Sequence, residues 1–195
     1  MKVRLILLRG HPRSSSKSIK AATKRLESLE GRVVRVRFLP ALTADRNRLY
    51  SNRPHGQPVF AGSFIRKRQI VLDQELERQP RELARILVHE LFHFAWVRLG
   101  NPARRSYEEL LRLEWKQRAR GELGWSAELR KNGLLEPPPS SSPLWRDYLC
   151  ESFCDTAAWI YSGVRRHPEY TLSPRHRNRR ADWFRAAFQG RQIPI

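Results

Sequence analysis

The stretch "RILVHELFHFAWVRLG", residues 85–100, places two histidines four residues apart in an otherwise apolar run, with a glutamate directly after the first. If this stretch is a helix, the imidazoles of His89 and His93 project from the same face and can reach one metal ion. Glu90 is rotated by about 100° from His89. That offset suits a carboxylate that contacts a metal-bound water rather than the metal itself. The pattern H-E-x-x-H therefore predicts a zinc site with Glu90 as general base.

A simpler interpretation is a core helix whose two histidines are satisfied by nearby carbonyl groups. That interpretation makes no demand on distant acids, whereas a catalytic zinc site needs a third protein ligand and an open position. Glu151 and Asp155 are four residues apart on a second predicted helix, so both carboxylates share one face. Glu151 can bind the metal, and Asp155 can accept the free N–H of a ligand histidine and fix its tautomer.

The alternative for Glu151 and Asp155 is a solvated acidic face. Against it, their helix is mostly apolar and aromatic, and unpaired carboxylates in such surroundings would cost free energy. Cys150 and Cys154 flank Glu151 and are either thiolate ligands or buried thiols; their helical angle differs from that of Glu151, which favours buried thiols. Their spacing suits a disulfide poorly.

The ends of the helix that carries H-E-x-x-H can be predicted. Pro80 suits its first turn, Gly100 can close it in the left-handed conformation, and Pro102 prevents its continuation. We expect this helix at about residues 80–99. A further helix is expected from Ser106, which forms a capping box with Glu109.

Other elements follow from hydrophobic spacing and from glycine and proline. We expect strands at "VRLILL" (3–8), "RVVRVRFL" (32–39) and, at a sheet edge, "SFIRKRQIVLD" (63–73). Helices are expected over 18–31 with a stop at Gly31, over 144–163 with a stop at Gly163, and over 173–190. Residues 40–62 and "EPPPSSSP" (136–143) are expected to be loops.

Length and composition indicate one globular domain over residues 1–195, with residues 1–62 as its N-terminal strand, helix and loop part. Six tryptophans and eight phenylalanines supply large burial units. No apolar run approaches the roughly 18–20 residues needed to span a bilayer. The N-terminal apolar stretch is interrupted by arginine, which argues against a signal peptide. We expect a cytoplasmic protein without a membrane partner.

The formal net charge of +19 raises the possibility of a nucleic-acid partner. The alternative is a compositional preference for arginine, because the cations are spread along the whole chain. The densest cluster is at the start of the last predicted helix and comprises Arg175, Arg177, Arg179 and Arg180.

"VHELFH" (88–93) followed by "ESFCD" (151–155) resembles the gluzincin zinc metallopeptidases, whose pattern is H-E-x-x-H on one helix and E-x-x-x-D on the next. The resemblance implies Zn²⁺ bound by His89, His93 and Glu151, with Glu90 as general base and Asp155 as partner of a ligand histidine. The second motif also looks like that of small intracellular repressor-cleaving metallopeptidases, which often have Asn in place of Asp155. In such folds the edge strand before the active-site helix binds extended substrate, a position that 63–73 would occupy.

Gluzincins usually add a His, Tyr or Arg that stabilises the oxyanion, and Tyr170 and His176 are candidates here. We therefore expect an α+β, zincin-like fold in which a small N-terminal sheet packs on the active-site helix and a helical C-terminal part follows. The expected function is hydrolysis of a protein or peptide substrate. The alternative is a basic DNA-associated zinc protein, either a tethered protease of the SprT-like kind or a non-catalytic zinc-binding module that binds nucleic acid through its arginine-rich surface.

Overall fold

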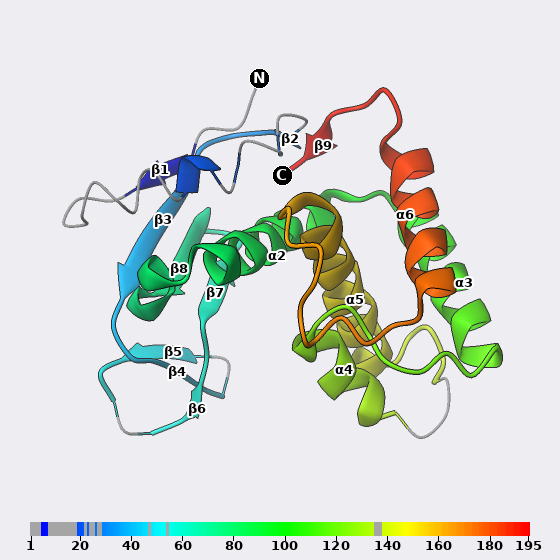
Figure 1. Ribbon diagram of the computed structural model, residues 1–195, viewed down its shortest axis with the longest axis horizontal. Coiled ribbons are helices and arrows are strands. Elements are labelled where there is room, and N and C mark those ends of the chain that lie inside the picture. Colours follow the sequence, from blue (N-terminus) through cyan, green and yellow to red (C-terminus); the bar gives the residue numbers. More distant parts are fainter. Residues whose placement is uncertain are drawn as a thin grey trace.

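The computed structural model describes residues 5–7, 19–21, 23, 26, 29–46, 48–53, 55–134 and 138–195. Strands dominate the first half of the chain and helices the second, so the expected α+β class is confirmed (Figure 1). A central helix lies between the two parts. In the part of the chain that is described, none of the helices has both the length and the apolar character needed to cross a membrane.

The main sheet has four strands in the order β1 (Leu5–Leu7), β3 (Val34–Leu39), β8 (Gln69–Asp73) and β7 (Ala61–Phe64). β1, β3 and β8 are parallel, and β7 pairs antiparallel with β8 at the edge. The side chains of Val34, Val36 and Phe38 alternate with exposed neighbours along β3. This alternation buries one face of β3 against the hydrophobic core.

The expectation of one strand over 63–73 is wrong. β7 ends at Phe64, a turn occupies residues 65–68, and β8 begins at Gln69. Arg68 closes the turn with a positive φ of 48°, and its N–H donates to the Ile65 carbonyl at 3.1 Å. No glycine or asparagine marks this left-handed position, so the sequence gives no turn signal. The edge position is correct for β7 alone, because β8 lies inside the sheet.

The expectation of a loop over 40–62 is also wrong. This region contains β4 (Leu42–Asp45), β5 (Arg48–Ser51) and β6 (Gln57–Pro58), which form a small antiparallel sheet in the order β5-β4-β6, and β7 begins at Ala61. The strands are short and largely polar. They therefore lack the hydrophobic alternation by which a strand is recognised.

The expected helix over 18–31 is shorter than predicted. Residues 19–21 and 23 are helical, but Leu29 and Glu30 form β2, which pairs in parallel with β9 (Ile193–Pro194). Gly31 has φ 153°, and a Cβ there would lie 2.0 Å from the carbonyl oxygen of Ile195. The C-terminal segment therefore passes where the last helical turn was expected.

Five α-helices and one 3₁₀ helix are described. They are η1 (Gln74–Arg78), α2 (Pro80–Arg98), α3 (Asn101–Lys116), α4 (Trp125–Asn132), α5 (Pro143–Tyr161) and α6 (Pro174–Phe188). α2 contacts β7 and β8 of the sheet and packs extensively on α5 (Figure 1). The expected extents of α2, α5 and α6 are confirmed to within two residues. Gly163 and Gly190 follow α5 and α6 with positive φ, as expected.

The helix expected from Ser106 begins five residues earlier, at Asn101. Gly100 caps its N-terminus with φ −66° rather than closing α2 in the left-handed conformation, and Pro102 lies in the first turn. Proline at that position starts a helix as well as it stops one, which is why the prediction failed. The hydroxyl of Ser106 lies 3.0 Å from the Ala103 carbonyl instead of capping.

A buried ionic network ties the C-terminal helices together. The guanidinium of Arg180 on α6 is fully buried and donates to the carboxylates of Glu114 on α3 and Glu122 in the segment before α4, with shortest distances of 2.6 and 2.7 Å. Tyr148 on α5 donates to Glu122 at 2.6 Å. Since a buried charge is tolerated only when it is paired and hydrogen-bonded, this network holds the helices in one arrangement.

Candidate metal centre

The two histidines of the H-E-x-x-H stretch face each other on α2. Their Nε2 atoms lie 3.2 Å apart, and the ring centroids are 4.9 Å apart with an interplanar angle of 76°. His89 is buried and His93 nearly so. The spacing of four residues on a helix has therefore directed both imidazoles to one point, as the sequence indicates.

Asp155 on α5 holds the other nitrogen of His89. Its Oδ1 accepts from His89 Nδ1 at 2.7 Å, and its Oδ2 accepts the backbone N–H of Ala127 at 3.0 Å. The carboxylate thus fixes the His89 ring so that Nε2 points towards His93. Gly124 packs against this carboxylate so closely that a Cβ there would lie 2.3 Å from it.

Glu151 on α5 approaches His89 as well. Its Oε2 lies 3.2 Å from His89 Nε2, while Oε1 lies 3.3 Å from the guanidinium of Arg130 on α4. Burial alone would raise the pKa of Glu151, but the adjoining His89 lowers it to about 2. Glu151 is therefore a carboxylate anion directed at His89.

The histidines respond to the same carboxylates. Burial by itself lowers the pKa of His89, but the charges of Asp155 and Glu151 outweigh burial and hold the pKa well above its usual value. For His93, burial is likewise outweighed, by Cys150 and Glu151, and the pKa rises to about 9. The carboxylates around the two imidazoles therefore favour positive charge at this place.

The two cysteines of α5 lie close to the histidines of α2. Cys150 Sγ is 3.4 Å from His93 Nδ1, and Cys154 is fully buried. One ligand atom each from His89, His93 and Cys154 lies within 4.8 Å of the others, so these three residues could hold a metal ion. Both thiols are free. Cys154 thus enters the cluster although sequence reasoning favoured an inert thiol.

Glu90 is directed away from the two imidazoles, towards the edge strand. Its Oε2 lies 2.6 Å from the hydroxyl of Ser63 on β7, and its backbone oxygen lies 2.9 Å from the same hydroxyl. The hydroxyl has one proton, so it donates to one of these oxygens at a time. Ser63 was not predicted as a site residue, and only its place in the strand before α2 could have indicated it.

A groove of about 390 Å³ runs past this cluster. Its lining comes from the first residue of β7 and the segment before it, from α2, from the start of α4 and from α5; it includes Phe60, Ile86, His89, Glu90, Trp125 and Asp155. Phe60 and Trp125 are 48% and 60% exposed, high values for aromatic side chains. The groove is therefore apolar at its mouth and carries polar groups at its base.

Among the described residues that line the groove, neither Tyr170 nor His176 is found. Tyr170 is buried in a small hydrophobic cluster with Leu123, Val164 and Leu172, and burial raises its pKa to about 12. His176 is buried on α6. Both were candidates for stabilising the oxyanion. In the described part of the chain, neither side chain contacts His89, His93, Glu151 or Cys154.

The arginine cluster at the start of α6 is largely used within the protein. Arg180 is ion-paired in the core with Glu114 and Glu122. Arg177 donates to two backbone carbonyls of the segment before the helix, and Arg179 donates to the side chain of Gln117 at 2.6 Å. These arginines are accounted for by packing and hydrogen bonding.

Comparisons with protein-family models, with curated proteins and with solved structures found no match to this chain. The residues of the candidate site are therefore the basis for assigning a function.

Proposed function

We propose that this protein is a zinc-dependent peptidase with a zincin-like fold, similar to the gluzincins. The observation that carries the proposal is the convergence of two separate sequence motifs. His89 Nε2 on α2 lies 3.2 Å from His93 Nε2 and 3.2 Å from Glu151 Oε2 on α5, while Asp155 holds the other nitrogen of His89. A pair of core histidines would not require two carboxylates from another helix to reach them.

The arrangement of these residues fits a tetrahedral metal. Two nitrogens bound to one zinc at about 2.0–2.1 Å lie about 3.3 Å apart, close to the separation of the two Nε2 atoms here. A zinc ion would supply the positive charge that the surrounding carboxylates favour. We assign His89, His93 and Glu151 as its ligands and Asp155 as the residue that orients His89.

Cys154 is the competing third ligand, because its thiol lies within reach of both histidines. Glu151 is favoured because its carboxylate is already ionised and directed at His89. Cobalt substitution separates the two, since a thiolate ligand gives sulfur-to-metal charge transfer in the near ultraviolet and a carboxylate does not. Loss of such a band in Cys154→Ser but not in Glu151→Gln would assign the thiol.

When bound, zinc supplies a Lewis acid that lowers the pKa of a coordinated water to about 7 and polarises a carbonyl group. Glu90 lines the groove together with His89, and its Oε2 accepts a hydrogen bond from the hydroxyl of Ser63. In that place its carboxylate can accept a proton from the attacking water and deliver it to the leaving amine. The chemistry that suits this set of groups is hydrolysis of an amide bond.

The edge strand offers a template for a peptide. The Asp73 N–H donates to the Phe60 carbonyl at 2.7 Å, so the alternation of an antiparallel pair directs the backbone groups of Gly62 and Phe64 towards β8 and those of Ala61 and Ser63 towards the free edge. An extended substrate that pairs with Ala61 and Ser63 passes directly over Glu90.

We do not extend the proposal to nucleic acid. The arginine cluster that raised this alternative is engaged in contacts within the protein at three of its four positions. The net charge alone is a weak guide to a specific partner.

Glu90→Gln tests the proposal. We expect this variant to retain its metal and to lose peptide hydrolysis by at least 100-fold, because the amide cannot accept a proton. Glu109→Gln, at an exposed position of α3, is the matched control and should keep full activity. A Glu90→Gln variant that hydrolyses peptides at the wild-type rate would exclude Glu90 as the base.

A further inference from the structure

A second and larger cavity continues the groove beyond Phe60. Its volume is about 920 Å³, and it shares Pro58, Val59 and Phe60 with the groove that holds His89 and Glu90. The shared residues are those that lead into β7. A chain paired with the free edge of β7 therefore reaches this cavity on the side of Ala61.

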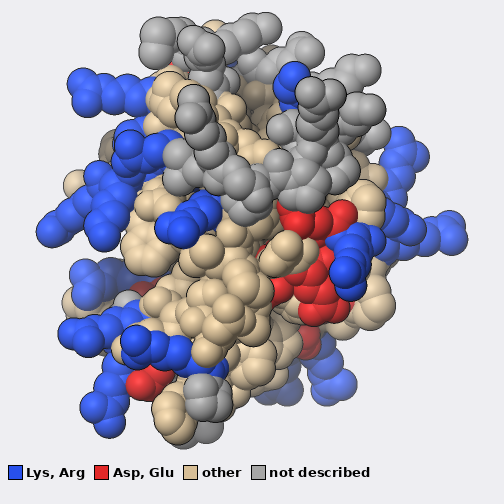
Figure 2. All heavy atoms as spheres, turned by 90° about the vertical axis from the view of Figure 1, so that its left-hand side faces the viewer, with Lys and Arg blue, Asp and Glu red and all other residues tan. Residues whose placement is uncertain are grey.

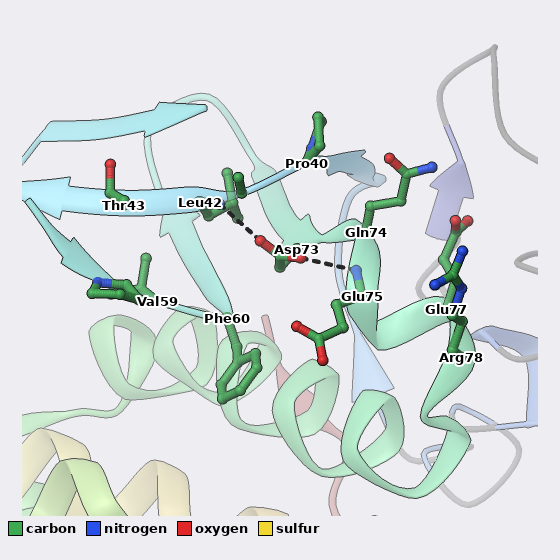
Figure 3. A pocket seen from close by; sticks show the side chains of 12 residues that line it. Pro40, Leu42, Thr43, Val59, Phe60, Asp73, Gln74, Glu75, Glu77 and Arg78 are labelled. Carbon is green, nitrogen blue, oxygen red and sulfur yellow. Dashed lines mark hydrogen bonds between the residues drawn. The ribbon is translucent and has the colours of Figure 1, made fainter. Parts of the chain in front are cut away.

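The floor of the larger cavity is acidic. Asp73, Glu75 and Glu77 line it together with Gln74 and Arg78, and Figure 3 shows Asp73 at its centre, hydrogen-bonded on both sides. Asp73 accepts the backbone N–H groups of Leu42 at 2.7 Å and Glu75 at 2.8 Å.

The exposed carboxylate of Glu75 accepts the side-chain N–H of Gln79 at 3.0 Å. The donors to Asp73 and Glu75 are neutral amides. They hold the two carboxylates in place and leave their negative charge available for a cation.

Acidic residues are the minority among the charged residues of this protein. The protein has 38 Lys and Arg against 19 Asp and Glu. In Figure 2, acidic side chains gather in one patch of the face shown, with lysine and arginine on either side. A cationic ligand is repelled by most of such a surface and attracted where carboxylates gather, so this distribution favours one place of binding.

Two exposed aromatic side chains line the groove that holds His89 and Glu90. Phe60 comes from the segment before β7 and Trp125 from the start of α4, and Ile86 on α2 lines the same groove. Phe60 is 48% exposed and Trp125 60%, so both rings leave apolar surface in contact with water. An apolar side chain of a ligand would bury them.

These features, together with the proposed peptidase function on which the inference rests, define a substrate class. We propose that the protein binds an extended basic segment of a polypeptide along β7, with an apolar side chain between Phe60 and Trp125 and an arginine or lysine in the acidic cavity. Glu90 contacts Ser63, and Phe60 precedes Ser63 by three residues, about 10 Å along a strand. In the antiparallel pairing, the direction beyond Phe60 is the C-terminal direction of the substrate. The basic residue then lies about three or four positions C-terminal to the cleaved bond.

The test uses fluorogenic peptides that differ only in whether arginine, glutamine or glutamate stands at the third or fourth position C-terminal to a common cleavage site. We expect kcat/KM to be about tenfold higher with arginine than with glutamine at low ionic strength, and the preference to shrink as salt rises. Glu75→Lys should abolish or reverse the preference. Glu109→Lys, an equal change of charge on exposed α3, should leave it intact.

Binding of the same labelled peptides to the Glu90→Gln variant is measured in parallel by fluorescence anisotropy. This readout separates the two proposals, because a preference for arginine that depends on Glu75 supports the cavity whether or not any peptide is cleaved. Cleavage with equal rates for arginine, glutamine and glutamate would overturn the inference and leave the peptidase proposal standing. Equal binding wherever arginine is placed would also overturn it, because that result indicates general attraction rather than a defined site.

Discussion

The hydroxyl of Ser63 on the edge strand lies 2.6 Å from Oε2 of Glu90 on α2. This contact links β7, the strand proposed to pair with a substrate, to Glu90, the carboxylate proposed to accept a proton from the attacking water. It also holds Glu90 in one orientation, rotated away from the histidines that flank it in the sequence.

Ser63→Ala removes this contact without disturbing the ligands. We expect kcat to fall by roughly tenfold with little change in KM or in metal content, because the carboxylate loses orientation rather than its charge. Steady-state kinetics over pH 5–9 checks this. Ser63→Thr, which restores a hydroxyl, should recover most of the activity. A loss confined to KM would assign Ser63 to substrate binding.

Gly124 faces the carboxylate that anchors His89. Because a Cβ at this position would lie 2.3 Å from Asp155, Gly124→Ala should displace the carboxylate and weaken zinc binding by about 10–100-fold. Metal affinity is measured by competition with a chromogenic chelator. Gly100→Ala is the control, since a Cβ there would lie 3.6 Å from Pro102 Cδ, an ordinary van der Waals distance. Equal affinities in the two variants would contradict the role given to Asp155.

The buried pair of Glu122 and Arg180 predicts an acid-dependent stability. Burial would raise the pKa of Glu122, but Arg180 and Lys131 lower it from 4.5 to about 2. A carboxylate with a depressed pKa stabilises the fold at pH values above 4.5, and this contribution is lost as the pH falls towards 2. The shift corresponds to about 3 kcal/mol.

We therefore expect Glu122→Gln to lower the free energy of unfolding by about 3 kcal/mol at pH 7, and the difference from wild type to diminish between pH 4.5 and pH 2. Urea unfolding at several pH values measures it. Glu109→Gln should follow the wild type throughout. A difference that stayed constant with pH would show that Glu122 acts by packing rather than by its charge.

The approach of His89 to Glu151 and Asp155 was predictable because much of the information is local, whereas the place of Cys154 in the cluster that could hold a metal was not predicted. His89 and His93 are placed by one helical turn and Glu151 and Asp155 by another. Pro80 and Gly163 mark the start of α2 and the end of α5 as predicted. Only the meeting of the two helices is tertiary. Buried carboxylates without a cation would be costly, and this requirement made the meeting predictable.

The rest of the site depends on contacts between distant segments. Ser63 reaches Glu90 because a turn at Arg68 folds β7 back on β8, and no residue in that turn signals it. Gly124 meets Asp155 across the packing of the segment before α4 on α5. The acidic cavity required the strands of residues 42–58, which are too short and polar to show a pattern.

The most direct test of the account is the metal content of the protein purified without added metal, for the wild type beside Glu151→Gln. We predict about one zinc per chain in the wild type and a large loss in the variant, since the ligands come from both α2 and α5. A folded wild type that binds no zinc, even after loading, would leave His89 and His93 as core residues and contradict the central claim.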